Sequence, residues 1–597
     1  MTAMLPWDQQ GLFHRVRKTE IAADWNEWTV DAKRPGLVAR PRVTWGDPRD
    51  YEPTALGVTF RRWNLPDCAW IGGDENFTDK RHVFRPGESV RKTLVIVNDR
   101  RVDQTVGWQV ACGAFAQQGE VRVAAGDQAR VPLAFAVGEA GTHRLSAEFR
   151  FEGGVVQKDA FDLTVLAPAA NPKAKLAVYD PKGLTAGNLK RLGLDFDLVT
   201  ELAGATSGGR VAVVGREALT PELYREQVLP LATRGGRVIL FEQTKSVLEA
   251  IGFRVQTYGM RHGFPRYRSA ALRASQREEL LRDWAGASTL VPGHTPNKAV
   301  ETWADHDTWA GWMHARPWRN GNRGAIATVI PEKPALGDWR ALVDGAFDLQ
   351  YAPLLEWRTR GGRILFCQMD VTGRTEPDPA ADDLVRRLVD EVRGENPGTW
   401  AAYPCGMQAY ASGLVRGEWT IEHDRAKTAT KLYYVTGGGA KRPDDFFDRI
   451  RNGATALLCG LTAAEVKAWS PVPLACAEVK GAYPTRIREL PPELNGLSNG
   501  DWSWHGGMDF AAFADDVPDG NAAFRVVRYG KGRLVFWQVP PWKIDDVNRP
   551  YLRISKRRAE AMLSRLMGNL GFNLPPVPHF YADVPVETDD PYRYFHW

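Results

Sequence analysis

The pattern of apolar and polar residues changes sharply along the chain. From about Leu56 to Ala167, apolar and polar residues alternate with period two in segments such as SVRKTLVIVND and THRLSAEFRF, separated by turn residues. Such alternation buries one face of each strand, and many short strands at regular spacing are typical of a sandwich. We therefore predict an Ig-like β-sandwich over residues 56–167.

A second pattern follows the Pro/Ala-rich linker at residues 167–174. Continuous apolar runs (KLAVYD, RVAVVG, RVILFEQ) alternate here with helical segments such as TPELYREQVLPLATRGG. Fully apolar strands separated by helices predict a parallel sheet covered by helices on both faces. The helix that closes this unit has Asp378 as its expected N-cap and stops at Gly394. We bound this first α/β domain at residues 173–397.

Residues 402–575 repeat the same order of elements and predict a second α/β domain. Three landmarks recur at measurable offsets: Gly236 as Gly453 (217), Asp283 as Asp501 (218) and Gly362 as Gly532 (170). The first copy therefore holds an insertion of about 48 residues (218 minus 170), at about residues 290–340. The two copies are expected to be tandem flavodoxin-like domains of the class I glutamine amidotransferase type.

Composition narrows the possible functions. The chain has 597 residues, 44% of them hydrophobic and 25% charged, which suggests about four globular domains. Lys and Arg outnumber Asp and Glu by only 77 to 72, so no overall field favours nucleic acid or anionic lipid. No apolar run approaches the roughly 18 residues of a membrane-spanning helix. We expect neither a nucleic-acid nor a membrane partner.

The chain is rich in tryptophan, and the insertion holds a cluster of them. The chain has 22 tryptophans, and the segment ETWADHDTWAGWMHARPWRNGNRG places four within residues 301–324. Indole faces stack on sugar rings, while nearby polar groups orient the hydroxyls. One interpretation is a saccharide-facing loop; another is an insertion that packs itself onto the sheet or a neighbouring subunit. The saccharide-binding candidates are Trp303, Trp309, Trp312, Trp318 and Arg319.

Metal and cofactor chemistry finds little support in the sequence. The six cysteines are scattered, without a CxxC pair or a His at ligand spacing, so no metal site is predicted. His306 lies between two aspartates, but three adjacent side chains point in different directions. No Gly-rich phosphate loop follows a predicted strand, and no cofactor is expected.

A cysteine nucleophile is the second chemistry to consider. Amidotransferases of this fold carry a G-x-C-x-G elbow after a strand, and neither copy has one. Cys459 ends a predicted strand before Gly460, and the 217-residue offset matches it to Glu242 in the first copy. An amidase that uses Cys459 is therefore an unfavoured alternative.

Several long strings resemble one group of proteins through nearly the whole chain. They are MLPWDQ, FTDKRHVFRPGESVRKTLVIVND, GNRGAIATVIPEKP, GRILFCQMDVTGRTEPDPAA and DPYRYFHW. They resemble the C-terminal portion of large bacterial proteins related to glycoside hydrolase family 2, the β-galactosidase and β-glucuronidase group. The resemblance implies that residues 1–55 end a (β/α)8 barrel, with Trp7 in the sugar subsite. Asp8 lies beside it, and residues 576–597 form the C-terminal tail.

The same resemblance implies where catalysis would take place. Retaining hydrolases of this clan use two barrel glutamates about 5 Å apart, and both would precede Met1. We expect the accessory and assembly portion of a hydrolase acting on β-linked glycosides, truncated or split from its barrel and inactive alone. The expected partners are carbohydrate, further copies of the chain and a separate catalytic barrel. Relatives imply a periplasmic or secreted full-length protein. A stand-alone carbohydrate-binding or oligomerisation scaffold is the main alternative.

Overall fold

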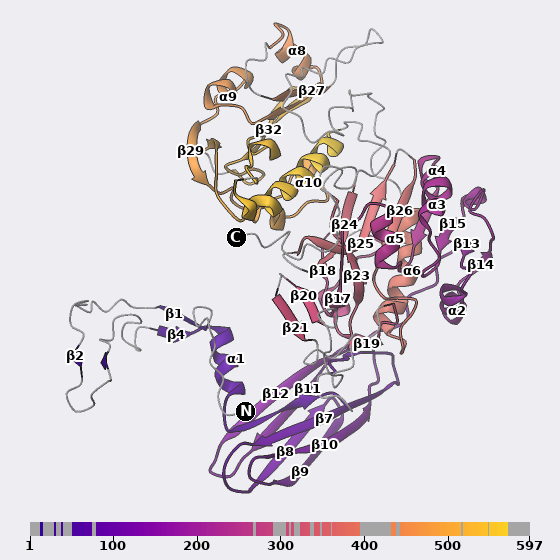
Figure 1. The fold of residues 1–597 in the computed structure, drawn as a ribbon, viewed down its shortest axis with the longest axis vertical. Coiled ribbons are helices and arrows are strands. Elements are labelled where there is room, and N and C mark those ends of the chain that lie inside the picture. Colours follow the sequence, from indigo (N-terminus) through magenta and orange to yellow (C-terminus); the bar gives the residue numbers. More distant parts are fainter. Residues whose placement is uncertain are drawn as a thin grey trace. The chain divides into compact units, whose positions relative to one another are not determined.

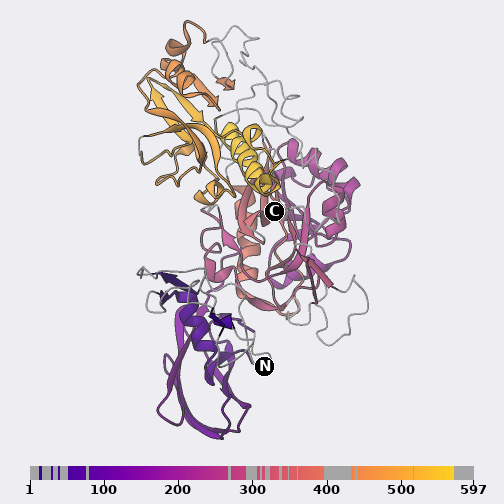
Figure 2. The same cartoon turned by 60° about the vertical axis from the view of Figure 1, so that its left-hand side comes forward.

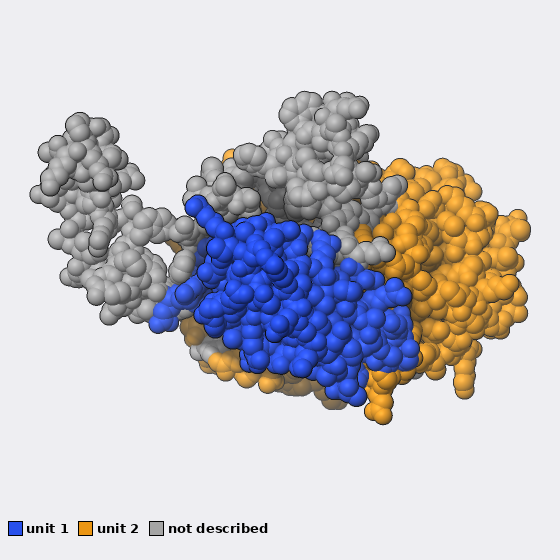
Figure 3. Space-filling view, turned by 90° about the horizontal axis from the view of Figure 1, so that it is seen from below, with its two compact units in different colours: residues 1–78, 87–137, 142–163 blue, residues 79–86, 138–141, 164–597 orange. Residues whose placement is uncertain are grey.

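The computed structural model describes most of the chain between residues 51 and 570. The described residues are 12–15, 29–30, 38–39, 51–74, 79–266, 270–290, 306–309, 312–315, 323–334, 339–346, 349–359, 361–394, 432–436, 442–514, 517–546 and 548–570. They fall into two compact units (Figure 3): residues 1–78, 87–137 and 142–163 form one, and residues 79–86, 138–141 and 164–597 the other. In this part of the chain, no helix has the length and apolar content needed to cross a bilayer.

The β-sandwich predicted from the alternating pattern is present. One sheet has the order β10 (Asp127–Ala136), β7 (Ser89–Asn98), β5 (Asp67–Gly72). The other has the order β6 (Val83–Phe84), β12 (Val156–Val165), β11 (Gly141–Arg150), β8 (Gln104–Cys112), β9 (Phe115–Val123) (Figure 1). Inward residues such as Leu94, Val106 and Phe149 are fully buried, as period-two alternation requires.

Only short elements are described before the sandwich. β1 (Phe13–Arg15) pairs antiparallel with β4 (Tyr51–Pro53), and β2 (Thr29–Val30) pairs antiparallel with β3 (Val38–Ala39). Helix α1 (Ala55–Trp63) follows, with Thr54 as its N-cap. Barrel strands run parallel, so these antiparallel pairs do not themselves indicate a barrel; a barrel end over residues 1–55 stays a prediction.

The first α/β half of the second unit is built on a mixed eight-stranded sheet. Its order is β14 (Phe196–Leu198), β13 (Leu176–Tyr179), β15 (Val211–Val214), β16 (Arg237–Leu240), β26 (Arg363–Cys367), β25 (Tyr351–Arg358), β24 (Trp339–Gly345), β18 (Phe264–Pro265). The first five strands are parallel, and in chain order their sequence across the sheet is 2-1-3-4-5. The predicted parallel sheet is therefore present, extended by an antiparallel edge.

Helices cover both faces of this sheet, as its continuous apolar strands require. The core on one face includes residues of α2 (Leu184–Arg191) and α6 (Pro379–Arg393), and the core on the other includes residues of α3 (Pro221–Leu223), α4 (Leu229–Thr233) and α5 (Lys245–Ala250). The side chain of Asp378 accepts hydrogen bonds from the N–H groups of Ala380 (2.8 Å) and Ala381 (3.2 Å), which confirms the predicted N-cap.

Short antiparallel pairs lie within the insertion of the first copy or join it to the strands that precede it. β20 (His306–Trp309) pairs with β21 (Trp312–Ala315), β19 (Trp284–Ala287) with β22 (Arg323–Gly324), and β17 (Val255–Met260) with β23 (Ala327–Pro331).

The second α/β half has a smaller sheet of the same kind. Its order is β27 (Leu432–Thr436), β28 (Thr455–Cys459), β32 (Gly532–Trp537), β31 (Phe524–Tyr529), with β31 antiparallel to the other three strands. Helix α10 (Arg553–Asn569) packs on one face, while α8 (Phe446–Arg451) and α9 (Ala463–Trp469) pack on the other (Figures 1 and 2). A separate antiparallel pair, β29 (Cys476–Ala482) and β30 (Met508–Phe513), lies between β28 and β31 in the chain.

Strand register fixes the correspondence between the two copies. Arg237 of β16 pairs with Arg363 of β26, and Thr455 of β28 pairs with Arg533 of β32. The paired residues are 126 apart in the first copy (363 minus 237) and 78 apart in the second (533 minus 455), so the two offsets must differ by 48. The offset of 170 between Gly362 and Gly532 therefore requires 218 at the preceding strand. The 217-residue offset from Gly236 to Gly453 is wrong by one residue. Cys459 consequently corresponds to Phe241, and not to Glu242.

A glutamine clamp supports this register independently. In the first copy the Gln368 amide accepts from the backbone N–H of Gln243 (2.8 Å) and donates to its carbonyl oxygen (2.9 Å). In the second copy Gln538 bonds the N–H and carbonyl of Leu461 in the same way, at 3.1 and 3.2 Å. The clamping glutamines of the two copies are 170 residues apart, and the backbone positions that they bind are 218 apart, which are the offsets that the strand register requires.

Candidate functional site

A cavity opens at the carboxyl ends of the parallel strands in the second α/β half. β27 ends at Thr436 and β28 at Cys459, and both residues line a cavity of about 1170 Å³. Open α/β sheets bind ligands beyond the carboxyl ends of their strands, where the loops leave a crevice. The other lining residues are Gly460, Thr462, Glu465, Glu478, Gly481, Gly507, Met508, Asp509, Phe510, Trp542, Lys543, Ile544, Asp545, Arg549 and Leu552.

The thiol at this edge lacks the environment of a catalytic nucleophile. Cys459 is 1% exposed, and burial strongly raises the pKa of its thiol. A catalytic cysteine requires the opposite shift, toward the thiolate. The backbone turns at Gly460, whose φ of 63° is left-handed and whose added Cβ would lie 2.8 Å from Pro540 Cγ. The strand end therefore shapes the cavity without supplying covalent chemistry.

The polar groups of the cavity are held by the backbone around them. Lys543 Nζ donates to the carbonyl of Gly460 at 2.9 Å, and burial lowers the pKa of this amine. Glu478 Oε1 accepts from the N–H of Ala463 at 2.8 Å, and Asp509 Oδ1 accepts from the N–H of Gly481 at 2.9 Å. Each carboxylate is positioned through one oxygen, which fixes its direction before any ligand arrives.

An indole completes the lining. Trp542 lies in a short 3-10 helix, Pro541–Lys543, directly beyond β32, and its side chain is half-buried against the core under α10. A half-buried indole presents an apolar face next to polar groups, a combination suited to sugar rings. The cavity thus joins a stacking surface to fixed acceptors and donors.

The equivalent edge of the first copy is closed by buried ions. Arg216, Glu242 and Asp370 are each no more than 1% exposed. Arg216 Nη1 lies 3.7 Å from Glu242 Oε1 and 3.5 Å from Asp370 Oδ1, so one guanidinium lies between two carboxyl groups. Thr372 donates to Glu242 from both its N–H (2.7 Å) and its hydroxyl (2.6 Å).

These two carboxyl groups fill the first edge and do not form an open site. Burial raises the pKa of both Glu242 and Asp370, and Arg216 offsets this only in part. Gly373 lies flat against Arg216, since an added Cβ would be 2.3 Å from the guanidinium carbon. Perturbed carboxyl pairs can mark catalysis. Here Thr372 donates to Glu242, Thr328 donates to Asp370, and all three charged side chains are buried.

The corresponding positions show how the two edges differ among the described residues. The offsets of 218 and 170 match Glu242 to Gly460 and Asp370 to Pro540. Both carboxyl groups are therefore replaced by residues without polar side chains.

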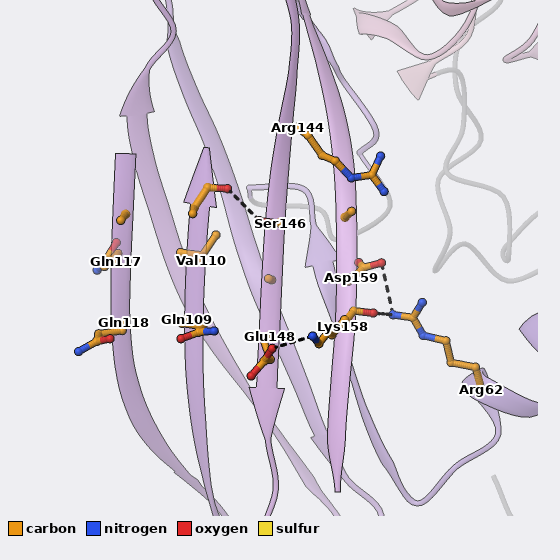
Figure 4. A pocket seen from close by; sticks show the side chains of 14 residues that line it. Arg62, Gln109, Val110, Gln117, Gln118, Arg144, Ser146, Glu148, Lys158 and Asp159 are labelled. Carbon is orange, nitrogen blue, oxygen red and sulfur yellow. Dashed lines mark hydrogen bonds and ion pairs between the residues drawn. The ribbon is translucent and has the colours of Figure 1, made fainter. Parts of the chain in front are cut away.

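A second cavity lies on the sandwich. It has about 960 Å³ and runs over β9, β8, β11 and β12 (Figure 4). Its charged groups are paired: Lys158 Nζ lies 3.1 Å from Glu148 Oε2, and Arg62 Nη2 lies 3.4 Å from Asp159 Oδ1. Gln109, Gln117 and Gln118 add neutral amides. Having no aromatic side chain, this groove is the weaker candidate for a sugar.

The predicted site residues are mostly outside the described residues. This applies to Trp7, Asp8, Trp303, Trp318 and Arg319. Trp309 and Trp312 are paired directly across the β20–β21 hairpin by their backbones. Their binding role stays a prediction. Among the described residues, no group of three His, Cys, Asp or Glu side chains is arranged to hold a metal ion.

Sequence reasoning missed the residues of the second cavity. Trp542 and Lys543 follow the strand GRLVFWQ within a few residues, and the rule that parallel strands bind ligands at their carboxyl ends could have indicated them. Glu478 and Asp509 come from β29 and β30, which no periodicity linked to this edge. Their convergence depends on the tertiary fold.

Comparison with known proteins adds little beyond this geometry. No family model and no curated protein matches the chain. The CARDB domain of a Pyrococcus furiosus protein is similar at 13% identity, covering 16% of this chain and 85% of its own, with a TM-score of 0.14. The PKD domain of an M14-like peptidase from a Thermoplasmatales archaeon is similar at 15% identity, covering 17% of this chain and 99% of its own, with a TM-score of 0.14. Neither likeness bears on function.

Proposed function

We propose that this chain is the accessory and assembly portion of a protein that acts on β-linked glycosides, and that it binds carbohydrate without hydrolysing it. The observation that carries the proposal is the cavity at the carboxyl edge of the second sheet, with Trp542 beside Glu478, Asp509 and Lys543. In this view the two α/β halves are flavodoxin-like, amidotransferase-related domains that have lost their nucleophile. Catalysis would belong to a separate barrel, whose end would be residues 1–55, and copies of the chain would associate.

Several features support binding in preference to chemistry. The carboxylates of the cavity accept backbone or local hydrogen bonds, as Glu478 and Asp509 do, and such anchoring suits recognition of hydroxyl groups. The order 2-1-3-4-5 of the parallel strands is the flavodoxin-like order. The motif resemblance to the β-galactosidase and β-glucuronidase group supplies the ligand class.

A stand-alone carbohydrate-binding or oligomerisation scaffold is the second candidate. It would use the same cavity and requires no barrel partner. The amidase alternative is disfavoured, because burial raises the pKa of the Cys459 thiol.

The test is calorimetric titration of the full chain with β-linked gluco- and galacto-oligosaccharides. We expect saturable binding that Trp542→Ala weakens about two- to tenfold or more, since stacking of an aromatic ring is worth roughly 0.5–1.5 kcal/mol in addition to its buried area. Tyr483→Ala is the matched control: Tyr483 is 57% exposed and lies outside the lining, so binding should not change.

Two outcomes would count against the proposal. Binding lost in Trp309→Ala but kept in Trp542→Ala would move the site to the Trp-rich insertion. Turnover of nitrophenyl β-galactoside or β-glucuronide by this chain would contradict binding without hydrolysis.

A further inference from the structure

The charge of the second cavity restricts which saccharides it can hold. Its ionisable lining consists of Glu465, Glu478, Asp509 and Asp545 against Lys543 and Arg549, an excess of two negative charges. Losing the proton of Lys543 would only enlarge this excess. An acidic ligand would add a negative charge to a cavity whose lining is already negative, and the like charges would repel.

The positive groups are poorly placed to counter such a ligand. Lys543 Nζ already donates to the Gly460 carbonyl at 2.9 Å. Arg549 is exposed, as Glu478 and Asp509 are, so water and salt screen all three charges and none outweighs the others by burial. Glu478 and Asp509 are fixed by backbone N–H groups. Ionised carboxylates accept hydrogen bonds and do not donate them. They therefore suit ligands with many hydroxyl donors.

The volume adds a second restriction. Small-ligand pockets typically enclose about 300–1,000 Å³, whereas this cavity has about 1170 Å³. It is lined by apolar side chains as well, among them Met508, Phe510 and Ile544. A single sugar ring would leave most of this surface uncovered.

We infer that the cavity of the second α/β half binds neutral β-linked oligosaccharides and discriminates against uronic-acid and phosphorylated sugars. This inference rests on the proposed function and specifies its ligand class. Trp542 would stack on one ring while Glu478 and Asp509 accept from its hydroxyls. Within the β-galactosidase and β-glucuronidase group, this favours the galactoside or glucoside type of ligand over the glucuronide type.

The experiment compares sugars that differ only at C6. Isothermal titration and saturation-transfer NMR of the full chain measure binding of β-linked gluco- and galacto-disaccharides and of the same disaccharides with one ring oxidised to the uronic acid. We expect the neutral sugar to bind at least about tenfold more tightly than its uronide at low salt, with the ratio falling as added salt screens the excess charge.

Charge-removing variants test the cause of the discrimination. Asp509→Asn and Glu478→Gln should each lower the ratio of neutral to uronide affinity several-fold, whatever they do to the neutral affinity itself. Asp448→Asn is the control, because Asp448 is 70% exposed on α8 outside the cavity, and the ratio should not change.

The outcomes separate this inference from the proposed function. If neither sugar of any pair binds, the proposed function fails and the inference with it. If the uronide binds as well as the neutral sugar or better, the inference is overturned while carbohydrate binding stands. A ratio that Asp448→Asn lowers as much as Asp509→Asn would also overturn it, because the discrimination would then reflect net charge and not the cavity.

Discussion

Arg266 joins the two α/β halves through a buried ion cluster, and replacing it with Met should loosen the second half. Its Nη1 lies 2.9 Å from Asp344 Oδ2, and its Nη2 contacts Asp501 Oδ2 in the other half. The side chain of Arg266 is 9% exposed and that of Asp501 is 10% exposed. Lys333 Nζ also pairs with Asp344, at 2.8 Å. Arg266→Met therefore leaves Asp344 with a cation and removes the close cation from Asp501.

The loss of stability in Arg266→Met follows from the difference between Asp344, which keeps a cation, and Asp501, which loses its close one. Removing one partner of a buried ion pair costs about 3–5 kcal/mol, because the remaining charge stays desolvated and uncompensated. Lys333 still compensates Asp344, and the N–H of Ser498 still donates to Asp501 at 2.8 Å, so we expect the lower end, about 3 kcal/mol. A second change, Asp501→Asn, removes the stranded charge and should recover a good part of this cost.

The pH dependence has a definite sign. Burial alone would raise the pKa of Asp501, but Arg266 outweighs it and holds the pKa below the ordinary 3.8. A carboxyl group with a depressed folded pKa contributes stability above its unfolded pKa, and this is lost as the pH falls through the folded value. The difference between the native chain and Arg266→Met should therefore be full near pH 7 and should narrow as the pH falls toward and below 3.8.

Native-state hydrogen exchange is the appropriate assay, since a chain of several domains does not unfold in two states. About 3 kcal/mol corresponds to a roughly 100-fold faster exchange of backbone amides around residues 494–503, because 1.4 kcal/mol is a factor of ten. Arg144→Met is the control: it breaks an exposed pair with Asp162 (side chains 66% and 51% exposed) and should change stability by less than about 0.5 kcal/mol. Acceleration below about fivefold in Arg266→Met at pH 7 would refute the reasoning.

Two further predictions concern packing and the buried thiol. Gly362→Ala should destabilise the first half by more than about 2 kcal/mol in thermal denaturation, because its Cβ would lie 2.1 Å from the carbonyl oxygen of Ala232. Gly107→Ala is the control: no atom lies within 4 Å of the added Cβ, so this change should be neutral or slightly stabilising. Iodoacetamide should alkylate half-buried Cys476 before buried Cys459, as peptide mass spectrometry would show; rapid loss of the Cys459 thiol under native conditions would revive the amidase alternative.

The elements that the sequence predicted well are those defined by local periodicity. Alternation gave the sandwich strands, continuous apolar runs gave β13, β15 and β16, and Asp378 followed by Pro379 gave the start of α6. Each of these signals depends on residues within a few positions of one another. Local signals survive folding because tertiary packing reinforces them.

The offset between the two copies shows the limit of matching residues by type alone, since it differs from the register by one residue. Residue type pairs Gly236 with Gly453, because both are glycines that precede an apolar strand. Strand register instead matches Gly453 to Gly235, where each N–H closes the preceding helix onto a carbonyl, Ala232 in one copy and Ile450 in the other. Residues of the two copies are therefore equivalent when they occupy the same place in the hydrogen-bond pattern, and not when they are of the same type. The one-residue error assigned Glu242 to the wrong partner.

The contrast between the two sheet edges is the feature that sequence alone could not supply. In the first copy two carboxyl groups and Arg216 are buried, although desolvating such a cluster costs several kcal/mol per ion unless every partner is satisfied. Thr372 donates to Glu242 and Thr328 donates to Asp370. Arg216 Nη1 and Asp370 Oδ1 form no hydrogen bond with the described residues and are held by the ion pair between them, at 3.5 Å. Such a cluster can be replaced by apolar residues only if both carboxyl groups are replaced, since a single remaining carboxyl group would be buried without its charged partner.

The second copy meets this condition at both carboxyl positions. Gly460 and Pro540 stand where Glu242 and Asp370 stand in the first. Pro540 packs against Gly460, and charged side chains lie instead at the rim, on Glu478, Asp509 and Lys543. There they remain in contact with water, so their charges require no buried partner. The first edge is filled by buried ions and the second is lined by exposed ones, and this contrast is the reason we propose that binding takes place in the second copy.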